Sequence, residues 1–161
     1  RKALEEIIYQ QEYFDETFFS YKEDVDLAFR LQLNGWKSWL NPKAVAYHDR
    51  TVLAPVEKMS KIQIFKNRQR KNKYSNYLSY RNGLYLIVKS LPKFNFKYLW
   101  SVLVYESIKF GYILIFETKS LKAWKDLFKN WNVMKAKRKL LWKSNRLTEK
   151  DIDKLIGFKV T

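Results

Sequence analysis

The chain has 161 residues, of which 47% are hydrophobic and 17% aromatic, enough for one packed domain and too much for a disordered tail. It has no cysteine, which excludes a disulfide scaffold, a cysteine-ligated zinc site and a cysteine nucleophile. Its 32 basic and 16 acidic side chains leave a net charge of +16, and a single histidine excludes a metal site built from several histidines of this chain. Because the sequence opens at Arg1 with neither an initiator methionine nor a signal peptide, we expect it to be the back part of a longer protein.

Charge is divided unevenly along the chain. Residues 1–57 carry 7 basic and 10 acidic side chains, whereas residues 58–161 carry 25 basic and 6 acidic ones. From Lys58 to Tyr105 there are 11 lysines or arginines, 10 aromatic residues and no acid. A basic surface with interleaved aromatic side chains suits two kinds of partner, an anionic membrane surface or single-stranded nucleic acid. We therefore expect two regions, 1–57 and a basic amphipathic region 58–161.

The first region is predicted to mix helices with two short strands. Residues 1–8 and 25–34 have helical character, and Gly35 stands where a helix C-terminal cap is expected. Residues 36–41 and 43–48 alternate between two faces, which predicts a pair of strands.

The second region is predicted to be helical. Apolar residues with helical spacing end before Pro92, and further helices are expected over 98–116, 121–130 and 133–143, with Thr148 as the N-cap of a last short helix. The stretch from Lys97 to Thr118 is the best candidate for a membrane span, but Glu106 and Lys109 interrupt it. We expect it to lie in the membrane plane or in the core, with both charged side chains turned to water.

An ordered series of motifs occupies residues 14–48. It reads F-D-E-T-F-F from Phe14, E-D-V-D-L-A-F-R from Glu23, G-W-K from Gly35 and P-K-A-V-A-Y-H from Pro42. These four pieces, in this order, resemble those of family 2 glycosyltransferases, especially the rhamnosyltransferase-like branch. Arg81-Asn82 is similar to the element that begins the C-terminal helices of that family.

The resemblance implies an α/β, GT-A-like fold, with residues 1–57 as the C-terminal part of the catalytic domain and a mostly α-helical region after them. It also implies inverting transfer of a sugar from a nucleotide-sugar donor to a lipid-linked or polysaccharide acceptor in bacterial cell-surface glycan synthesis. The nucleotide-binding half and the Asp-x-Asp metal motif of the family are not in the sequence, so we expect them upstream.

Asp24 is the predicted catalytic base. Inversion needs one group that takes the proton of the acceptor hydroxyl, and a helix start favours a negatively charged side chain. The resemblance assigns this role to Asp24, with Glu23 flanking and orienting it. The alternative is that Asp24 and Asp26 only stabilise the start of a helix. Arg30 is expected to pair with Asp26 four residues earlier.

His48 is the predicted metal ligand. The resemblance implies that it binds a divalent cation or touches the diphosphate, and a neutral imidazole suits Mn better than Mg. Other ligands would come from the missing half. The alternative is a structural or surface histidine.

Two further residues are candidates for substrate binding. Trp36 could stack on a sugar face or pack in the core. Arg81 belongs to a basic stretch that could contact phosphate or simply face solvent; the other members are Arg68, Arg70, Lys71 and Lys73.

The sequence as a whole predicts a glycosyltransferase bound peripherally to the cytoplasmic face of the membrane, with no nucleic acid as partner. Two alternatives remain, a basic nucleic-acid-binding module and a non-catalytic membrane-surface module. The first lacks any zinc finger, ribonucleoprotein motif or glycine-rich clamp, and it leaves the acidic block 14–30 unexplained.

Overall fold

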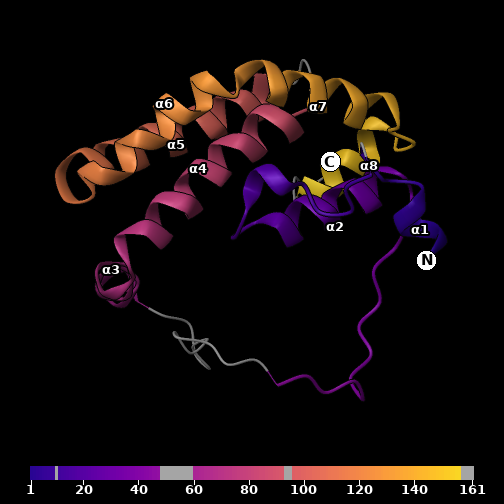
Figure 1. Cartoon of the computed structure of the whole chain (residues 1–161), viewed down its shortest axis with the longest axis horizontal. Helices are drawn as coiled ribbons and strands as arrows, with labels where there is room; N and C mark the ends of the chain where they lie inside the picture. Colours follow the sequence, from indigo (N-terminus) through magenta and orange to yellow (C-terminus); the bar gives the residue numbers. More distant parts are fainter. Residues whose placement is uncertain (10, 48–59, 93–95, 157–161) are drawn as a thin grey trace.

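The structure, a computed structural model, describes residues 1–9, 11–47, 60–92 and 96–156 (Figure 1). Its helices are α1 (Lys2–Glu5), α2 (Glu23–Leu33), α3 (Lys61–Arg70), α4 (Lys73–Ser90), α5 (Phe96–Phe116), α6 (Lys122–Lys129), α7 (Trp131–Lys143) and α8 (Glu149–Ile156). Two short 3-10 turns, η1 (Glu16–Phe18) and η2 (Thr118–Leu121), complete the regular structure. Within the described residues there is no strand and only one isolated bridge, between Tyr9 and Glu12.

The predicted α/β, GT-A-like fold is therefore wrong, because the described part of the chain is all-α. Residues 36–47 form an exposed chain that leaves the helices (Figure 1), with Trp39 89% and Tyr47 99% exposed. A strand needs a neighbouring strand to bond its backbone N–H and C=O groups, and the described residues offer none. The alternation of side chains between two faces, on which the strands were predicted, does not provide a neighbouring strand. His48 and the predicted boundary at residue 57 lie outside the described residues.

The predicted helices are largely confirmed, with ends shifted by a few residues. Gly35 ends α2 in the left-handed region at φ +84°. The Gly35 N–H donates to the Gln32 carbonyl over 2.8 Å and the Trp36 N–H donates to the Leu31 carbonyl over 3.0 Å, the bonding pattern of a glycine C-cap. Thr148 caps α8, since its hydroxyl accepts the Asp151 N–H.

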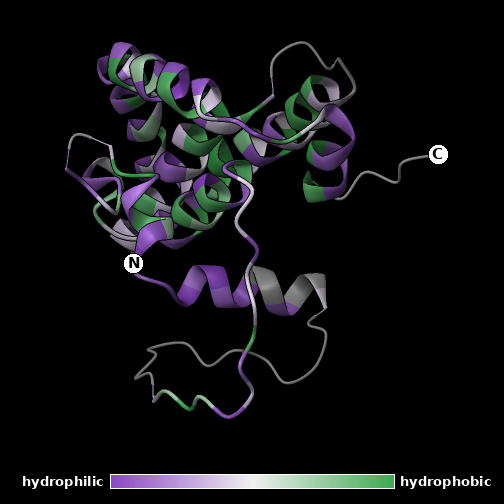
Figure 2. Cartoon of the chain, turned by 90° about the vertical axis from the view of Figure 1, so that its right-hand side faces the viewer, coloured by the Kyte–Doolittle hydropathy of each residue, from purple (hydrophilic) through white to green (hydrophobic). Residues whose placement is uncertain are grey.

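Helix α3 was not singled out by the sequence, although a local signal for it exists. The Ser60 hydroxyl accepts the Gln63 N–H over 3.2 Å, and the Gln63 side chain accepts the Ser60 N–H over 2.8 Å, a reciprocal cap at the helix start. Figure 2 shows α3 apart from the other helices, with a hydrophilic second half. Arg68 ties it to the end of α5 by two bonds to the Glu117 carboxylate, of 2.5 and 2.9 Å.

The core lies between α4 and the arc that α6 and α7 form over it (Figure 1). Aromatic residues of α4 dominate it, and their hydroxyls find partners inside the bundle. The Tyr80 hydroxyl accepts the Trp124 indole N–H over 3.0 Å, and the Tyr85 hydroxyl accepts the Asn130 amide over 2.9 Å. A second, smaller cluster of Leu33, Leu141 and Ile152 joins α2, α7 and α8.

A buried network of charges connects four segments that are distant in sequence. The Lys89 ammonium group of α4 contacts the Asp15 carboxylate at 2.7 Å and the Asp26 carboxylate of α2 at 2.6 Å. Lys137 of α7 binds Asp15 from the other side, and Arg30 donates to Asp26 over 2.9 Å, which confirms the predicted pair. All five side chains are at least 93% buried, so each charge depends on these partners for its stability.

Arg30 also holds the N-terminal residues on this network. Its guanidinium group donates to the Ile7 carbonyl over 2.8 Å and to the Tyr13 carbonyl. The segment before α2 thus packs on the helices through a buried cation that bonds three separate acceptors.

Removal of the Asp15 charge is expected to destabilise the whole fold. The variant Asp15→Asn keeps the shape of the side chain but leaves Lys89 and Lys137 without one of their anions, so the free energy of unfolding should fall by about 3 kcal/mol or more. Burial raises the pKa of Asp15, but the charge of Lys89 and hydrogen bonds from Lys137, Lys89 and Thr17 outweigh it and lower this pKa from 3.8 to about 2.

Because this pKa is lower in the folded chain, the stabilising contribution of Asp15 is complete above about pH 4 and is lost as the pH falls towards 2. It amounts to about 2 kcal/mol. Urea unfolding between pH 2 and pH 6 measures both effects, with Glu16→Gln, an exposed neighbour, as the matched control. The network would not hold the fold together if Asp15→Asn were as stable as the control and if its free energy of unfolding changed with pH between 2 and 4 in the same way as that of the unaltered chain.

Candidate functional site

The Glu-Asp-Val-Asp sequence begins α2 and sends its two aspartates to opposite environments. Asp24 is exposed, and its Oδ1 accepts the N–H of the next residue, Val25, over 2.8 Å. Asp26 is 1% exposed and bound to Arg30 and Lys89. Two residues along a helix correspond to a rotation of about 200°, so one aspartate can face solvent while the other faces the bundle. Asp24 is therefore the carboxylate that an external molecule can reach.

The loop before Asp24 has an unusual backbone. Phe19, Tyr21 and Lys22 have φ values of 60°, 71° and 70°, in the left-handed half of the map that side chains with a Cβ rarely occupy. Such a conformation costs about 1 kcal/mol or more per residue and persists only where surrounding contacts impose it.

Asn82 of α4 imposes this conformation. Its side-chain amide is fully buried and donates to three carbonyls of the loop, those of Phe18 at 2.9 Å, Ser20 at 2.7 Å and Tyr21 at 2.7 Å. The loop thus reaches Glu23 and Asp24 from a fixed support on the central helix.

Arg81 supports the same loop. Its Nη2 donates to the Thr17 carbonyl over 3.1 Å and to the Phe18 carbonyl over 3.0 Å. The guanidinium group also lies over the rings of Tyr77 and Tyr85, with its carbon 5.7 and 5.3 Å from their centroids. The structure therefore places this predicted substrate-binding residue beside the loop, with its donors directed at protein carbonyls.

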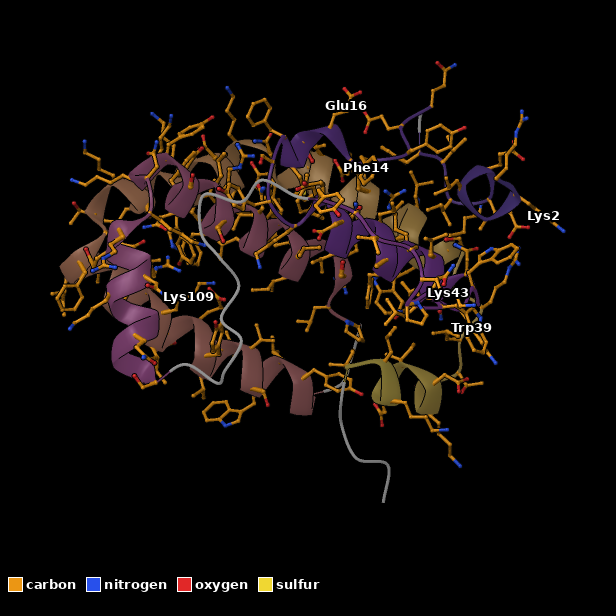
Figure 3. The ribbon with its side chains drawn as sticks, turned by 90° about the horizontal axis from the view of Figure 1, so that it is seen from below. Lys2, Phe14, Glu16, Trp39, Lys43 and Lys109 are labelled. Carbon is orange, nitrogen blue, oxygen red and sulfur yellow. The ribbon has the colours of Figure 1, made fainter. Side chains whose placement is uncertain are left out.

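Two lysines and a glutamate lie beside the start of α2. A Cβ built on Gly83 would lie 3.6 Å from Lys109 Nζ and 3.7 Å from Lys22 Cε, so both lysines rest against the same turn of α4. Lys109 Nζ contacts the Glu106 carboxylate at 3.0 Å and lies over the Tyr80 ring, between α5 and α4 (Figure 3). Burial, and then the charge of Lys109, lower the pKa of Lys22. The two lysines can balance negative charge that develops beside Asp24.

The predicted site residues are only partly brought together. Glu23, Asp24 and Arg81 all border the loop at the start of α2. Trp36 follows the other end of this 11-residue helix, about 16 Å away, where its indole N–H donates to the Glu6 carboxylate over 3.1 Å. His48 lies outside the described residues.

A cleft of about 360 Å³ lies away from Asp24. It is lined by the segment between α1 and η1 and by residues of α2, α4 and α7, including Asp15, Arg30, Lys89 and Lys137. The charged groups in its wall bind one another in the buried network, so we interpret it as part of the fold's support and not as a substrate site.

The metal centre stays a prediction, because His48 lies outside the described residues and its other ligands are expected in the missing half. Nowhere in residues 1–9, 11–47, 60–92 and 96–156 do three His, Asp or Glu side chains gather closely enough to hold an ion. No step of the chemistry proposed below is assigned to a metal.

The basic stretch divides into paired and exposed groups. Arg68 and Arg81 bind protein acceptors, whereas Arg70, Lys71 and Lys73 are exposed. Lys22 and Asn82 are parts of the site that the sequence did not predict. Lys109 stood out in the sequence only as an interruption of an apolar helix, although a charge in such a helix is itself a sign of a specific partner.

Comparison with known proteins adds no relative: no family model, curated protein or solved structure matches the chain. The function proposed for the chain rests on its motifs and on the geometry above.

The loop geometry is expected to depend on Asn82. In Asn82→Ala, three loop carbonyls lose their common donor, so the free energy of unfolding should fall by about 3 kcal/mol and the amides of residues 18–22 should exchange faster with solvent. Hydrogen–deuterium exchange and urea unfolding measure these effects. Asn132→Ala, on an exposed position of α7, is the matched control. Slow exchange retained at residues 18–22 in Asn82→Ala would argue against this support.

Proposed function

We propose that the chain supplies the catalytic base and the acceptor side of an inverting glycosyltransferase. The observation that carries this proposal is that the two aspartates of α2 have different surroundings. Asp26 is buried in the ion network, and Asp24 is exposed at the helix start. A helix N-terminus favours the carboxylate form that a base requires. The ordered motifs of residues 14–48 support the same assignment.

In this mechanism the acceptor hydroxyl approaches Asp24. The carboxylate oxygen that does not accept the Val25 N–H takes the hydroxyl proton while the hydroxyl oxygen attacks the anomeric carbon of the donor sugar. The bond from that carbon to the nucleoside diphosphate breaks on the opposite face, so the configuration is inverted and the diphosphate leaves with the bonding electron pair. The nucleotide is held by a half of the enzyme that is not in this sequence.

Neighbouring groups position the base. The strained loop, fixed by Asn82, sets where α2 begins and therefore where Asp24 points. Glu23 flanks it, and one of its carboxylate oxygens is buried with no hydrogen-bond partner among the described residues. Lys22 and Lys109 add positive charge near the developing alkoxide or the phosphate groups. The acceptor is a lipid-linked or polysaccharide glycan at the cytoplasmic face of the membrane.

A second candidate function is a non-catalytic membrane-surface module. The exposed apolar side of α5, described below, favours it, and it requires no role for Asp24. The two functions differ in whether turnover depends on Asp24.

Replacement of the base tests the proposal. In a polypeptide that joins these residues to a nucleotide-binding half, Asp24→Asn should lower kcat by about 10²- to 10⁴-fold with the free energy of unfolding and donor affinity nearly unchanged. Steady-state transfer assays and donor binding by calorimetry provide the measurements.

Asp26→Asn is the matched comparison on the same helix turn. It should act through stability, since it leaves Lys89 and Arg30 without a buried partner. Near-native turnover by Asp24→Asn, or equal loss of turnover per folded molecule in both variants, would remove Asp24 from the role of base.

A further inference from the structure

Helix α5 turns the side chains of Glu106 and Lys109 towards the protein and many of its apolar side chains outwards. The side chains of Glu106 and Lys109 are only 13% and 19% exposed, and Lys109 Nζ lies 4.8 Å from the Tyr80 ring centroid of α4. The prediction that both turn to water is therefore wrong. Residues 98–116 are long and apolar enough to cross a membrane, yet only 6% of that window is buried inside the protein.

The outer side of α5 is a continuous apolar surface, here called the α5 face. Its members are Leu99, Trp100, Leu103, Val104, Ile108, Leu114 and Ile115, between 43% and 73% exposed. Ile108 and Ile115 are the most exposed, at 71% and 73%. A folded protein rarely leaves so many neighbouring large apolar side chains in water without a partner for them.

A groove of about 570 Å³ between α5 and α6 extends this face. Its walls are mainly apolar and aromatic; they are formed by Leu103, Glu106, Ser107, Phe110, Leu121, Trp124 and Phe128. Phe128 is 69% exposed at its rim. Fluid hydrocarbon chains can fill a groove of this kind without a matching shape.

The elements that form one wall of the groove also carry exposed lysines. They come from η2 and α6 and are Lys119, Lys122, Lys125 and Lys129, of which Lys122 lies over the Tyr77 ring of α4. These charges would repel those of a second copy, but they complement anionic headgroups next to an apolar layer. The inward position of Glu106 and Lys109, with Lys109 over the Tyr80 ring of α4, also favours a helix lying along a surface over one crossing it.

We propose that the α5 face and its groove dock onto an anionic lipid bilayer, with α5 parallel to the membrane and the lysines of α6 at the headgroups. The apolar side chains enter the boundary between headgroups and acyl chains, and the bundle stays on the aqueous side. This docking does not depend on glycosyl transfer, so its test and that of Asp24 can fail separately.

Vesicle binding by the purified chain tests the proposal. It should co-sediment with vesicles of phosphatidylcholine and phosphatidylglycerol, and binding at high salt should be reduced but not lost because apolar contacts persist. The double variant Ile108→Ser/Ile115→Ser should bind these vesicles at least about tenfold more weakly. Lys125→Gln and Lys129→Gln should each weaken binding by about fivefold at low salt, and only to anionic vesicles.

The matched control is Trp39→Ser with Leu40→Ser, which removes two side chains that are 89% and 91% exposed. Figure 3 shows Trp39 and Lys43 at the opposite end of the molecule from Lys109, so this control should bind vesicles like the unaltered chain. Circular dichroism and urea unfolding establish that each variant is folded. Quenching of Trp100 by brominated lipid, lost in Trp100→Phe, places α5 in the bilayer.

Four results would overturn the proposal. They are equal vesicle binding by the isoleucine variant and the control, complete release of the chain at high salt, tight binding of single-stranded RNA without vesicle binding, and a lipid-free dimer that the isoleucine variant abolishes. RNA binding would assign the basic side chains to a nucleic acid, and such a dimer would assign the α5 face to a second copy of the chain.

Discussion

The structure depends on the buried contacts that Lys89 makes with Asp15 and Asp26. Charges that leave water are stable only when opposite charges and hydrogen bonds replace the lost hydration, so these groups hold one another in one arrangement. Because Asp15 precedes η1, Asp26 lies on α2 and Lys89 on α4, the network fixes the N-terminal segment against the central helix. Lys137 extends the same constraint to α7.

The candidate site follows from this constraint. Once Asp26 is bound inside the bundle, helix geometry places Asp24 on the outer side of α2. Asn82 then holds the loop that leads into the helix in a backbone conformation that it would not adopt alone. The exposed carboxylate is thus positioned by buried groups, and this rigid support is what a catalytic base needs.

Helix α5 shows the same separation of surfaces on a larger scale. Its Glu106 and Lys109 side chains pair with each other on the protein side, where Lys109 lies over the Tyr80 ring of α4, and many of its apolar side chains are left outside. In water alone this arrangement is unfavourable, since the usual contribution of apolar residues to stability comes from their burial. A bilayer would bury them without unfolding any part of the protein, and it would bring a lipid-linked acceptor to the same protein as Asp24.

The sequence by itself determined most helices, the Gly35 and Thr148 caps, the Arg30–Asp26 pair and the Glu23–Asp24 candidates, because each depends on residues within a few positions of one another. The tertiary structure decided the rest. Residues 36–47 alternate like a strand but lack a neighbouring strand among the described residues, and the partners of Asp15 lie 74 and 122 residues away, at Lys89 and Lys137. Contacts between residues that are distant in sequence also bring Lys22 and Asn82 to the site and turn Lys109 inwards. Local patterns cannot encode which distant side chains meet, since that depends on how whole helices pack.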